Sequence, residues 1–179
     1  MRDRPGRRPD SGGRSTVFGM RGAVACEHPN AVLASIRVLD EGGDAADACV
    51  AMAALMAVLA PMTTGMGGDA LLLFYDASTK QMVGMDGSGR APWGATIEKL
   101  RGRGIEDMPE HGGLTVTVPG TVKLWDDAAK NLGRLPLSRL LEPAREAAEV
   151  GYPVSEVVAR YWERDESLLR KNEAATAVF

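Results

Sequence analysis

The sequence has few of the residues that bind metal ions or form disulfides. Among its 179 residues there are two cysteines, Cys26 and Cys49, and two histidines, His28 and His111. These histidines and cysteines are too few and too widely spaced for a metal cluster. Both cysteines lie in apolar surroundings, which favours buried free thiols over a disulfide. The sequence therefore predicts no metal site.

The chain also has no large excess of charge. Its net charge of −3 at pH 7 implies neither nucleic acid nor an anionic membrane as a partner. The first fifteen residues hold five arginines but no apolar run, so they do not have the pattern of a secretory signal. We expect residues 1–18 to be a disordered basic tail and the protein to be cytoplasmic.

One apolar run, residues 48–60, stands out, but it is shorter than the roughly 20 residues needed to cross a bilayer. It predicts a core helix and no membrane as a partner. Asp44 can cap the start of this helix, and Asp47 adds favourable charge in its first turn. Because the helix has no polar face, we expect it to be covered on all sides. Pro61 ends it.

A β-hairpin is predicted directly after this helix. Residues 63–69 form a Gly-rich turn, and residues 70–75 are too apolar for a half-exposed strand. Residues 81–85 supply the second strand. We expect the apolar helix to lie on a buried hairpin, which gives a layered α/β core.

The other elements follow from periodicity and turn residues, and residues 19–179 are expected to form one domain. Residues 22–26 and 114–118 are predicted strands. Asn30 is the expected cap of a helix whose apolar stripe includes Val32, Ile36 and Leu39. Pro143 either kinks a helix or lies in the first turn of a new one. Helices are predicted over residues 30–40, 97–101, 121–132 and 137–150, with a last one capped by Ser155.

Two loops are candidates for binding. The Gly-rich turn at residues 63–69 can present backbone N–H groups to an anion, but it lacks the Lys-Ser/Thr ending of a P-loop, and a structural turn is the favoured interpretation. In the loop 86–92, Arg90 can hold a carboxylate through two parallel hydrogen bonds, or be a solvated surface arginine. Ser88 can donate a hydrogen bond nearby but has no activating base. A Ser/His/acid triad with His28 is unsupported.

Three blocks then occur in a fixed order. They are GAVACEHPNAVLASIRVLDEGGDAADACVA, GMGGDALLLFYDASTKQMVGMDGSGRAP and GGLTVTVPGTVKLWDDAAKNLGRLPLSRLLEPAREAAEVGYPVS. Together, over roughly residues 19–155, they resemble the N-terminal part of the large subunit of the gamma-glutamyltranspeptidase family. Each motif is weak alone, and their combination in this order is specific.

The resemblance implies an N-terminal-nucleophile hydrolase fold, a four-layer αββα sandwich of which only the N-terminal part is present. Members of this family are precursors that cut themselves, and the new N-terminal threonine of the small subunit attacks a gamma-glutamyl donor such as glutathione. The acyl group then passes to an amino acid, a peptide or water. The expected partners are the donor and the missing C-terminal part or small subunit, and no cofactor is implied.

The same resemblance implies that the nucleophile lies outside this chain and that the chain alone is inactive. The five threonines of the matched blocks lie at the wrong positions to be the nucleophile: Thr63, Thr64, Thr115, Thr117 and Thr121. A non-enzymatic binding or structural domain is one alternative, and an anion-binding protein is another.

The chain departs from the family at the donor site. The family's arginine for the donor's α-carboxylate lies three places before an Ala-Pro pair, and here that place is Ser88. Arg90 instead immediately precedes Ala91 and Pro92. Arg90 and Ser88 are therefore the candidate substrate-binding residues, with Arg90 supplying the charge from a shifted position. A related acylase with a different donor is the alternative within the family.

Overall fold

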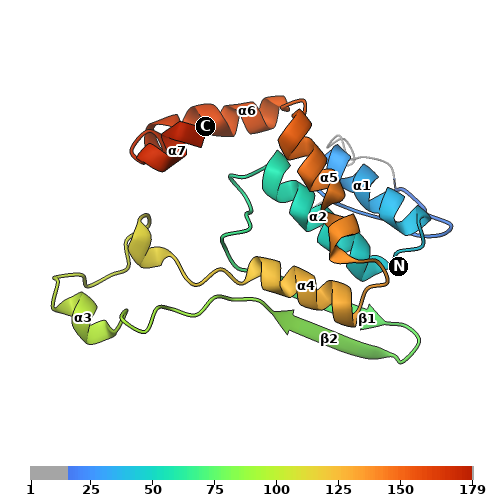
Figure 1. The fold of residues 1–179 in the computed structure, drawn as a ribbon, viewed down its shortest axis with the longest axis horizontal. Helices are drawn as coiled ribbons and strands as arrows, with labels where there is room; N and C mark the ends of the chain where they lie inside the picture. The colour runs from blue at the N-terminus through green and yellow to red at the C-terminus, as the bar shows by residue number, and fades with distance from the viewer. Residues whose placement is uncertain (1–15, 179) are drawn as a thin grey trace, which may run out of the picture.

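The structure is a computed structural model that describes residues 16–178, so the predicted tail at residues 1–18 lies mostly outside the described residues. Figure 1 shows helix α2 in the centre, with α1 and α5 beside it and the β1–β2 hairpin below α4. None of the helices in residues 16–178 combines the length and apolarity that crossing a membrane requires. In chain order the elements are α1 (Pro29–Asp40), α2 (Ala45–Leu59), β1 (Leu71–Asp76), β2 (Gln81–Asp86), α3 (Ile97–Arg101), the 3-10 helix η1 (Gly113–Thr115), α4 (Thr121–Asn131), α5 (Leu137–Val150), α6 (Glu156–Leu169) and α7 (Glu173–Val178).

Helix α2 begins as predicted. The Asp44 carboxylate accepts the N–H groups of Ala46 at 2.9 Å and Asp47 at 3.2 Å, and the Asp47 carboxylate accepts the N–H of Asp44 at 3.0 Å. This reciprocal capping box satisfies donors that the first turn of a helix leaves unpaired. Helices α1, α4 and α5 pack against α2 and bury most of its length.

One stripe of α2 is less well covered. Cys49 is exposed, and Met52, Ala53 and Ala57 are only partly buried. These positions are three and four residues apart, so they share one side of the helix. The expectation of complete cover is wrong for this stripe, because the described residues pack against the other sides of α2. Both cysteines are free, as predicted, but neither Cys26 nor Cys49 is fully buried.

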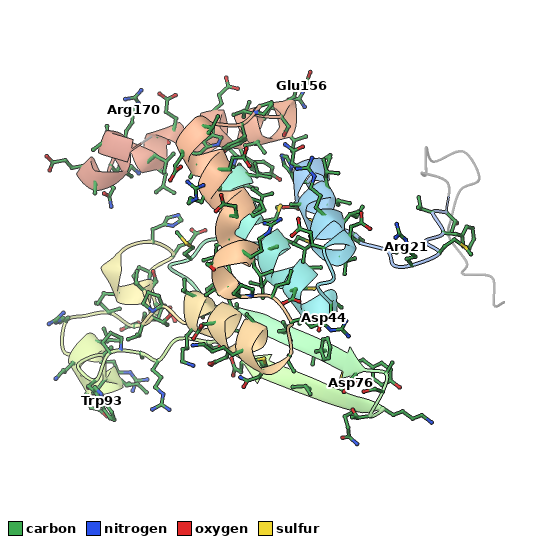
Figure 2. All side chains as sticks on the ribbon, turned by 45° about the vertical axis from the view of Figure 1, so that its right-hand side comes forward. Arg21, Asp44, Asp76, Trp93, Glu156 and Arg170 are labelled. Carbon is green, nitrogen blue, oxygen red and sulfur yellow. The ribbon has the colours of Figure 1, made fainter. Side chains whose placement is uncertain are left out.

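The β1–β2 hairpin forms with Leu71 opposite Asp86 and Asp76 opposite Gln81. Helix α4 packs against both β2 and α2, so it is α4 rather than α2 that lies on the hairpin (Figure 1). Leu72 and Met85 point from the inner face of the hairpin towards the core. The distal turn is held by Asp76, which is labelled in Figure 2.

The outer face of the hairpin is apolar and open to solvent. Leu71 is 77% exposed, Leu73 80%, Tyr75 56% and Met82 63%. In the part of the chain that the structure describes, nothing covers this face, and the sheet has only two strands. The prediction of a hairpin buried on both faces is therefore wrong. The composition of β1 indicates burial, but the residues present supply only one of the two covering layers.

The two other predicted strands do not form. Residues 22–26 are extended but unpaired, and residues 114–118 begin in the 3-10 helix η1 and continue as coil. Residues 114–118 alternate as a strand does and residues 22–26 are apolar like a buried strand, but a strand needs a neighbour to satisfy its backbone groups. Within residues 16–178 the hairpin alone provides ladder pairing.

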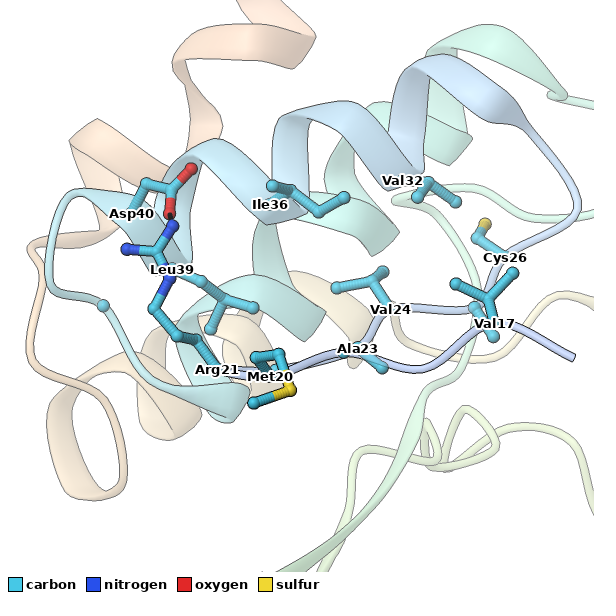
Figure 3. A pocket seen from close by; sticks show the side chains of 14 residues that line it. Val17, Met20, Arg21, Ala23, Val24, Cys26, Val32, Ile36, Leu39 and Asp40 are labelled. Carbon is cyan, nitrogen blue, oxygen red and sulfur yellow. Dashed lines mark ion pairs between the residues drawn. The ribbon is translucent and has the colours of Figure 1, made fainter.

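Helix α1 is capped by His28 rather than by Asn30, because the Nδ1 atom of His28 accepts the N–H of Asn30 at 3.2 Å. The buried face of α1 carries small residues, including Ala31 and Ala34, which allow α1 to lie close to α2. The predicted stripe of Val32, Ile36 and Leu39 instead faces the N-terminal segment (Figure 3). The stripe is real, but it is not the face that enters the core.

The α4–α5 connection is fixed by a buried carboxylate. The Asp47 side chain is fully buried and accepts the N–H groups of Arg134 at 2.9 Å and Leu135 at 3.4 Å, besides that of Asp44. A Cβ at Gly133 would overlap the same carboxylate. Helix α5 then runs through Pro143 as one element, which decides between the two alternatives left by the sequence.

Candidate functional site

Three segments far apart in sequence meet at the end of the hairpin nearest α4. They are residues 65–70, 86–92 and 117–121, and we call them the loop cluster. The N–H of Gly87 donates to the carbonyl of Ala70 at 2.8 Å, and the N–H groups of Gly120 and Thr121 donate to the carbonyl of Gly68 at 3.2 and 3.1 Å. The N–H of Val118 donates to the carbonyl of Arg90 at 3.0 Å, so residues 65–70 and 117–121 both contact the candidate loop 86–92.

The Gly-rich turn contributes acceptors to this cluster. The carbonyl of Gly68 also accepts the Thr121 hydroxyl at 2.8 Å. Asp69 Oδ1 accepts the N–H of Gly89 at 2.7 Å and the hydroxyl of Thr117 at 3.1 Å. A turn that presents a carbonyl and a carboxylate is unsuited to an anion, so the contacts support the structural interpretation of residues 63–69.

Glycines allow the three segments to approach so closely. A Cβ at Gly120 would overlap the carbonyl oxygen of Gly87, and a Cβ at Gly89 would overlap the carbonyl oxygen of Val118. A Cβ at Gly87 would lie 2.8 Å from the Cβ of Leu124 in α4. The Gly-rich character of these loops therefore reflects backbone contact as well as turn formation.

The structure places the two candidate residues, Ser88 and Arg90, in the same exposed loop of this cluster. Among the described residues, none forms a hydrogen bond or ion pair with the Arg90 side chain. The backbone carbonyl of Arg90 accepts the N–H of Val118 at 3.0 Å. Arg90 therefore has a fixed backbone and an unengaged guanidinium that faces solvent.

Ser88 is already engaged with its neighbour Asp86. Its backbone N–H donates to Asp86 Oδ1 at 2.8 Å. The Ser88 hydroxyl first, and this N–H second, lower the pKa of Asp86 below its usual value. The carboxylate of Asp86 thus remains an acceptor that orders the start of the loop, and Ser88 is a weaker candidate than Arg90 for contact with a ligand.

The structure gives no support to a triad or a metal site. His28 acts as the cap of α1, and in residues 16–178 no group of three or more His, Cys, Asp or Glu side chains has the arrangement of a metal site. The pair Asp126 and Asp127 lies on the surface of α4 and forms ion pairs with Lys130 and Lys123.

A separate hollow lies elsewhere. It has a volume of about 840 Å³ and lies between residues 17–26 and the Val32, Ile36 and Leu39 stripe of α1 (Figure 3). The ion pair between Arg21 and Asp40, at 3.4 Å, closes one end. Its lining is mainly aliphatic and includes neither Ser88 nor Arg90, so it is not the candidate donor site.

Sequence reasoning missed two residues of the loop cluster. Asp69 was visible as the last residue of the GMGGD motif, and Thr117 as a polar position of the supposed strand 114–118. Asp69 bonds to Gly89, which lies 20 residues later in the chain, and to Thr117, which lies 48 residues later. No periodicity or spacing rule could have connected them.

Comparisons with known proteins agree with this architecture. The family model described as gamma-glutamyltranspeptidase matches residues 31–179. A curated relative, the glutathione hydrolase-like YwrD proenzyme of Bacillus subtilis, is 38% identical over 165 residues, which is 92% of this chain and 31% of the relative. The glutathione hydrolase proenzyme of the same species is 35% identical over 145 residues, 79% of this chain and 25% of its own length.

Solved structures show the same fold. The gamma-glutamyltranspeptidase of Helicobacter pylori matches with a TM-score of 0.83 and 30% identity, over 90% of this chain and 47% of that one. The cephalosporin acylase of Bacillus halodurans matches with a TM-score of 0.85 and 38% identity, over 93% of this chain and 31% of that one. These matches confirm the predicted fold class, that of the N-terminal-nucleophile hydrolases.

The chain spans a quarter to a third of the length of these two curated relatives. The family model nevertheless covers most of the chain, including α1, the hairpin, the whole loop cluster and α4 to α6. The chain therefore belongs to the gamma-glutamyltranspeptidase family.

Proposed function

We propose that the chain is the N-terminal part of a gamma-glutamyltransferase or hydrolase. The complete enzyme moves a gamma-glutamyl group from glutathione or a similar donor to an amino acid, a peptide or water. The reaction passes through a threonyl acyl-enzyme, and the threonine belongs to a segment that follows these residues. This chain contributes part of the scaffold and one wall of the donor pocket.

The observation that carries this proposal is the apolar outer face of the hairpin. Four large side chains, Leu71, Leu73, Tyr75 and Met82, are more than half exposed on one face of a two-stranded sheet. Apolar patches of this kind on soluble proteins mark a surface that another element covers. A second sheet stacked on this face is what a four-layer sandwich requires. The same patch argues against an independent binding domain of these residues alone.

At the donor pocket, Arg90 binds the donor's α-carboxylate and Ser88 lies beside it. The Arg90 guanidinium faces solvent without a partner among the described residues, while its backbone is held by Val118. Two parallel N–H donors match the two oxygens of a carboxylate, so a fixed arginine selects donors that carry one.

An acylase with a different donor is the second candidate. Ser88 occupies the place where the family's carboxylate-binding arginine is expected, and a solved structure similar to this chain is named a cephalosporin acylase. A glutaryl group has the carboxylate of a gamma-glutamyl group but lacks its α-ammonium. Relative activity on gamma-glutamyl and glutaryl donors therefore distinguishes the two candidate functions. Arg90 binds the donor's carboxylate in both.

Self-cleavage tests the proposed function as a whole. When the longer reading frame is expressed, we expect a precursor that cuts itself into two pieces, the second of which begins with threonine. Mass spectrometry and N-terminal sequencing of the purified pieces check this result. A precursor that stays intact, or a second piece without an N-terminal threonine, contradicts the proposal.

Replacing Arg90 with alanine tests the donor site. In the self-cleaved enzyme we expect Arg90→Ala to raise the donor KM about 30-fold with a smaller change in kcat, because a charge-assisted pair made in the ground state is lost. Three anilide donors are compared: gamma-glutamyl, glutaryl and 4-aminobutyryl, the last of which has no carboxylate. The increase in KM should appear for the gamma-glutamyl and glutaryl donors and not for the 4-aminobutyryl donor.

The matched control for this prediction is Arg101→Ala, which removes another exposed arginine, in α3, and should leave all three KM values unchanged. If Arg90→Ala and Arg101→Ala behave alike, Arg90 is a surface residue and the assignment of the donor site is wrong.

A further inference from the structure

A single oxygen atom links the three segments of the loop cluster. Oδ1 of Asp69 lies 2.7 Å from the N–H of Gly89 and 3.1 Å from the hydroxyl of Thr117. Both donors therefore converge on one atom of the Gly-rich turn. Hydrogen bonds to an ionised acceptor are roughly twice as strong as those between neutral groups. The carboxylate can therefore order a loop that its own sequence leaves flexible.

The backbone is held on both sides of Arg90 by this arrangement. The residue before it, Gly89, donates its N–H to Asp69, and the carbonyl of Arg90 itself accepts the N–H of Val118 at 3.0 Å. Thr117, which also donates to Asp69, directly precedes Val118. The backbone of Arg90 thus lies between two supports, and both supports lead back to Asp69.

The loop needs such support because of its composition. Residues 86–92 read DGSGRAP, with glycines at two of the four positions before Arg90. Glycine loses more backbone freedom on ordering than any other residue, so an unsupported loop of this kind samples many conformations. A bidentate pair between arginine and a carboxylate requires a defined direction of approach. Misplacement by about 1 Å is enough to weaken a binding site severely.

We infer that Asp69 is the positioning residue of the donor site, which holds Arg90 in place through Gly89 and Thr117 without contacting the donor itself. This inference rests on the proposed role of Arg90 in binding the donor's carboxylate. It adds a residue of the Gly-rich turn to the site and gives that turn a function beyond entry into the hairpin.

The chemistry of Asp69 supplies a sensitive control. Both hydrogen bonds are accepted by Oδ1, and an asparagine side chain has an equivalent carbonyl oxygen. Asp69→Asn therefore preserves the two contacts and removes only the negative charge, whereas Asp69→Ala removes both contacts. Thr117→Val removes one contact and retains the shape of the side chain.

The experiment uses the self-cleaved full-length enzyme and the gamma-glutamyl anilide donor. We expect Asp69→Ala to raise the donor KM about tenfold while kcat changes less than twofold. Asp69→Asn keeps both contacts but loses the charge that strengthens them, so it should raise KM by only about threefold, as should Thr117→Val. Equal KM values for Asp69→Ala and the unmodified enzyme, or an Asn variant as impaired as the Ala variant, overturn the inference.

A double-mutant cycle distinguishes positioning from a general structural role. If Asp69 acts through Arg90, then Asp69→Ala adds nothing to KM once Arg90 has been replaced with alanine. Effects that multiply in the double variant overturn the inference while leaving the role of Arg90 intact. If Arg90→Ala alone leaves KM unchanged, the assignment of the donor site fails, and the inference fails with it. The two failures are therefore distinguishable in one set of variants.

Native-state proteolysis gives a second readout that is independent of donor binding. Trypsin cleaves after Arg90 only when the loop leaves its ordered conformation. We expect Asp69→Ala to speed this cleavage about tenfold, and Asp69→Asn to speed it only about threefold. Equal cleavage rates in all three proteins overturn the inference, whatever the kinetics show.

Discussion

Replacing Asp47 with alanine is expected to lower the free energy of unfolding by about 3–4 kcal/mol, because three backbone donors lose their acceptor inside the protein. The N–H groups of Asp44, Arg134 and Leu135 all point at this carboxylate. The substitution removes the Asp47 half of the capping box of α2 and the link to the α4–α5 connection together. Urea unfolding of the full-length protein, followed by far-ultraviolet circular dichroism, measures the loss.

Two variants control this experiment. Asp47→Asn retains one acceptor oxygen, so its free energy of unfolding should fall between those of Asp47→Ala and the unmodified protein. Asp126→Ala breaks an exposed ion pair with Lys130 on α4 and should cost less than about 0.5 kcal/mol. If Asp47→Ala and Asp126→Ala have similar stabilities, the buried carboxylate is not the link that the contacts indicate.

Replacing Gly120 with alanine is expected to destabilise the protein by about 3 kcal/mol and to disturb the proposed donor site. The added Cβ would overlap the carbonyl oxygen of Gly87, a backbone atom that cannot rotate away. Gly120 has a φ of −110° and a ψ of −18°, which alanine adopts without strain. The cost therefore comes from the close approach alone. Thermal unfolding and the donor KM measure the two effects.

The control for Gly120 is Gly67→Ala in the neighbouring turn. An added Cβ there meets no atom within 4 Å, so the change should be within about 0.5 kcal/mol of neutral. If the Gly120 and Gly67 variants have the same stability and the same donor KM, the contact between residues 87 and 120 does not hold the loop cluster together.

The sequence predicted the helices well because their signals are local. The capping pair of Asp44 and Asp47 marks the start of α2, and the glycine after α1 marks its end. Helix α3 has the bounds expected from the sequence. Each of these signals lies within a few residues of the element that it defines, so one sequence is enough to find it.

Strand formation could not be predicted in the same way. Residues 22–26 and 114–118 have strand-like sequences, but pairing depends on a neighbouring strand that residues 16–178 do not supply. The prediction that β1 is buried is wrong for a related reason, because burial of Leu71 and Leu73 requires a layer from outside the hairpin. Periodicity indicates that a segment is suited to form a strand, but it does not show which neighbouring strand or layer is present.

The candidate site was predictable only in part. The position of Arg90 beside Ala91 and Pro92 is a local pattern, and it is the signal by which the sequence indicates the loop 86–92 as a candidate. The carboxylate of Asp69 bonds to Gly89 in that loop and to Thr117, which lie 20 and 48 residues later in the sequence. Such contacts result from the packing of α4 on the hairpin, which no short motif encodes.

Where nothing else covers it, the hairpin also affects how this stretch of chain behaves in concentrated solution. Each of its two strands has one side whose backbone N–H and C=O groups are unpaired within residues 16–178, and Leu71 and Leu73 flank the free side of β1 with apolar surface. An open strand of this kind is a template on which a second copy can add its own strand. Self-association of this stretch of chain should then increase with protein concentration.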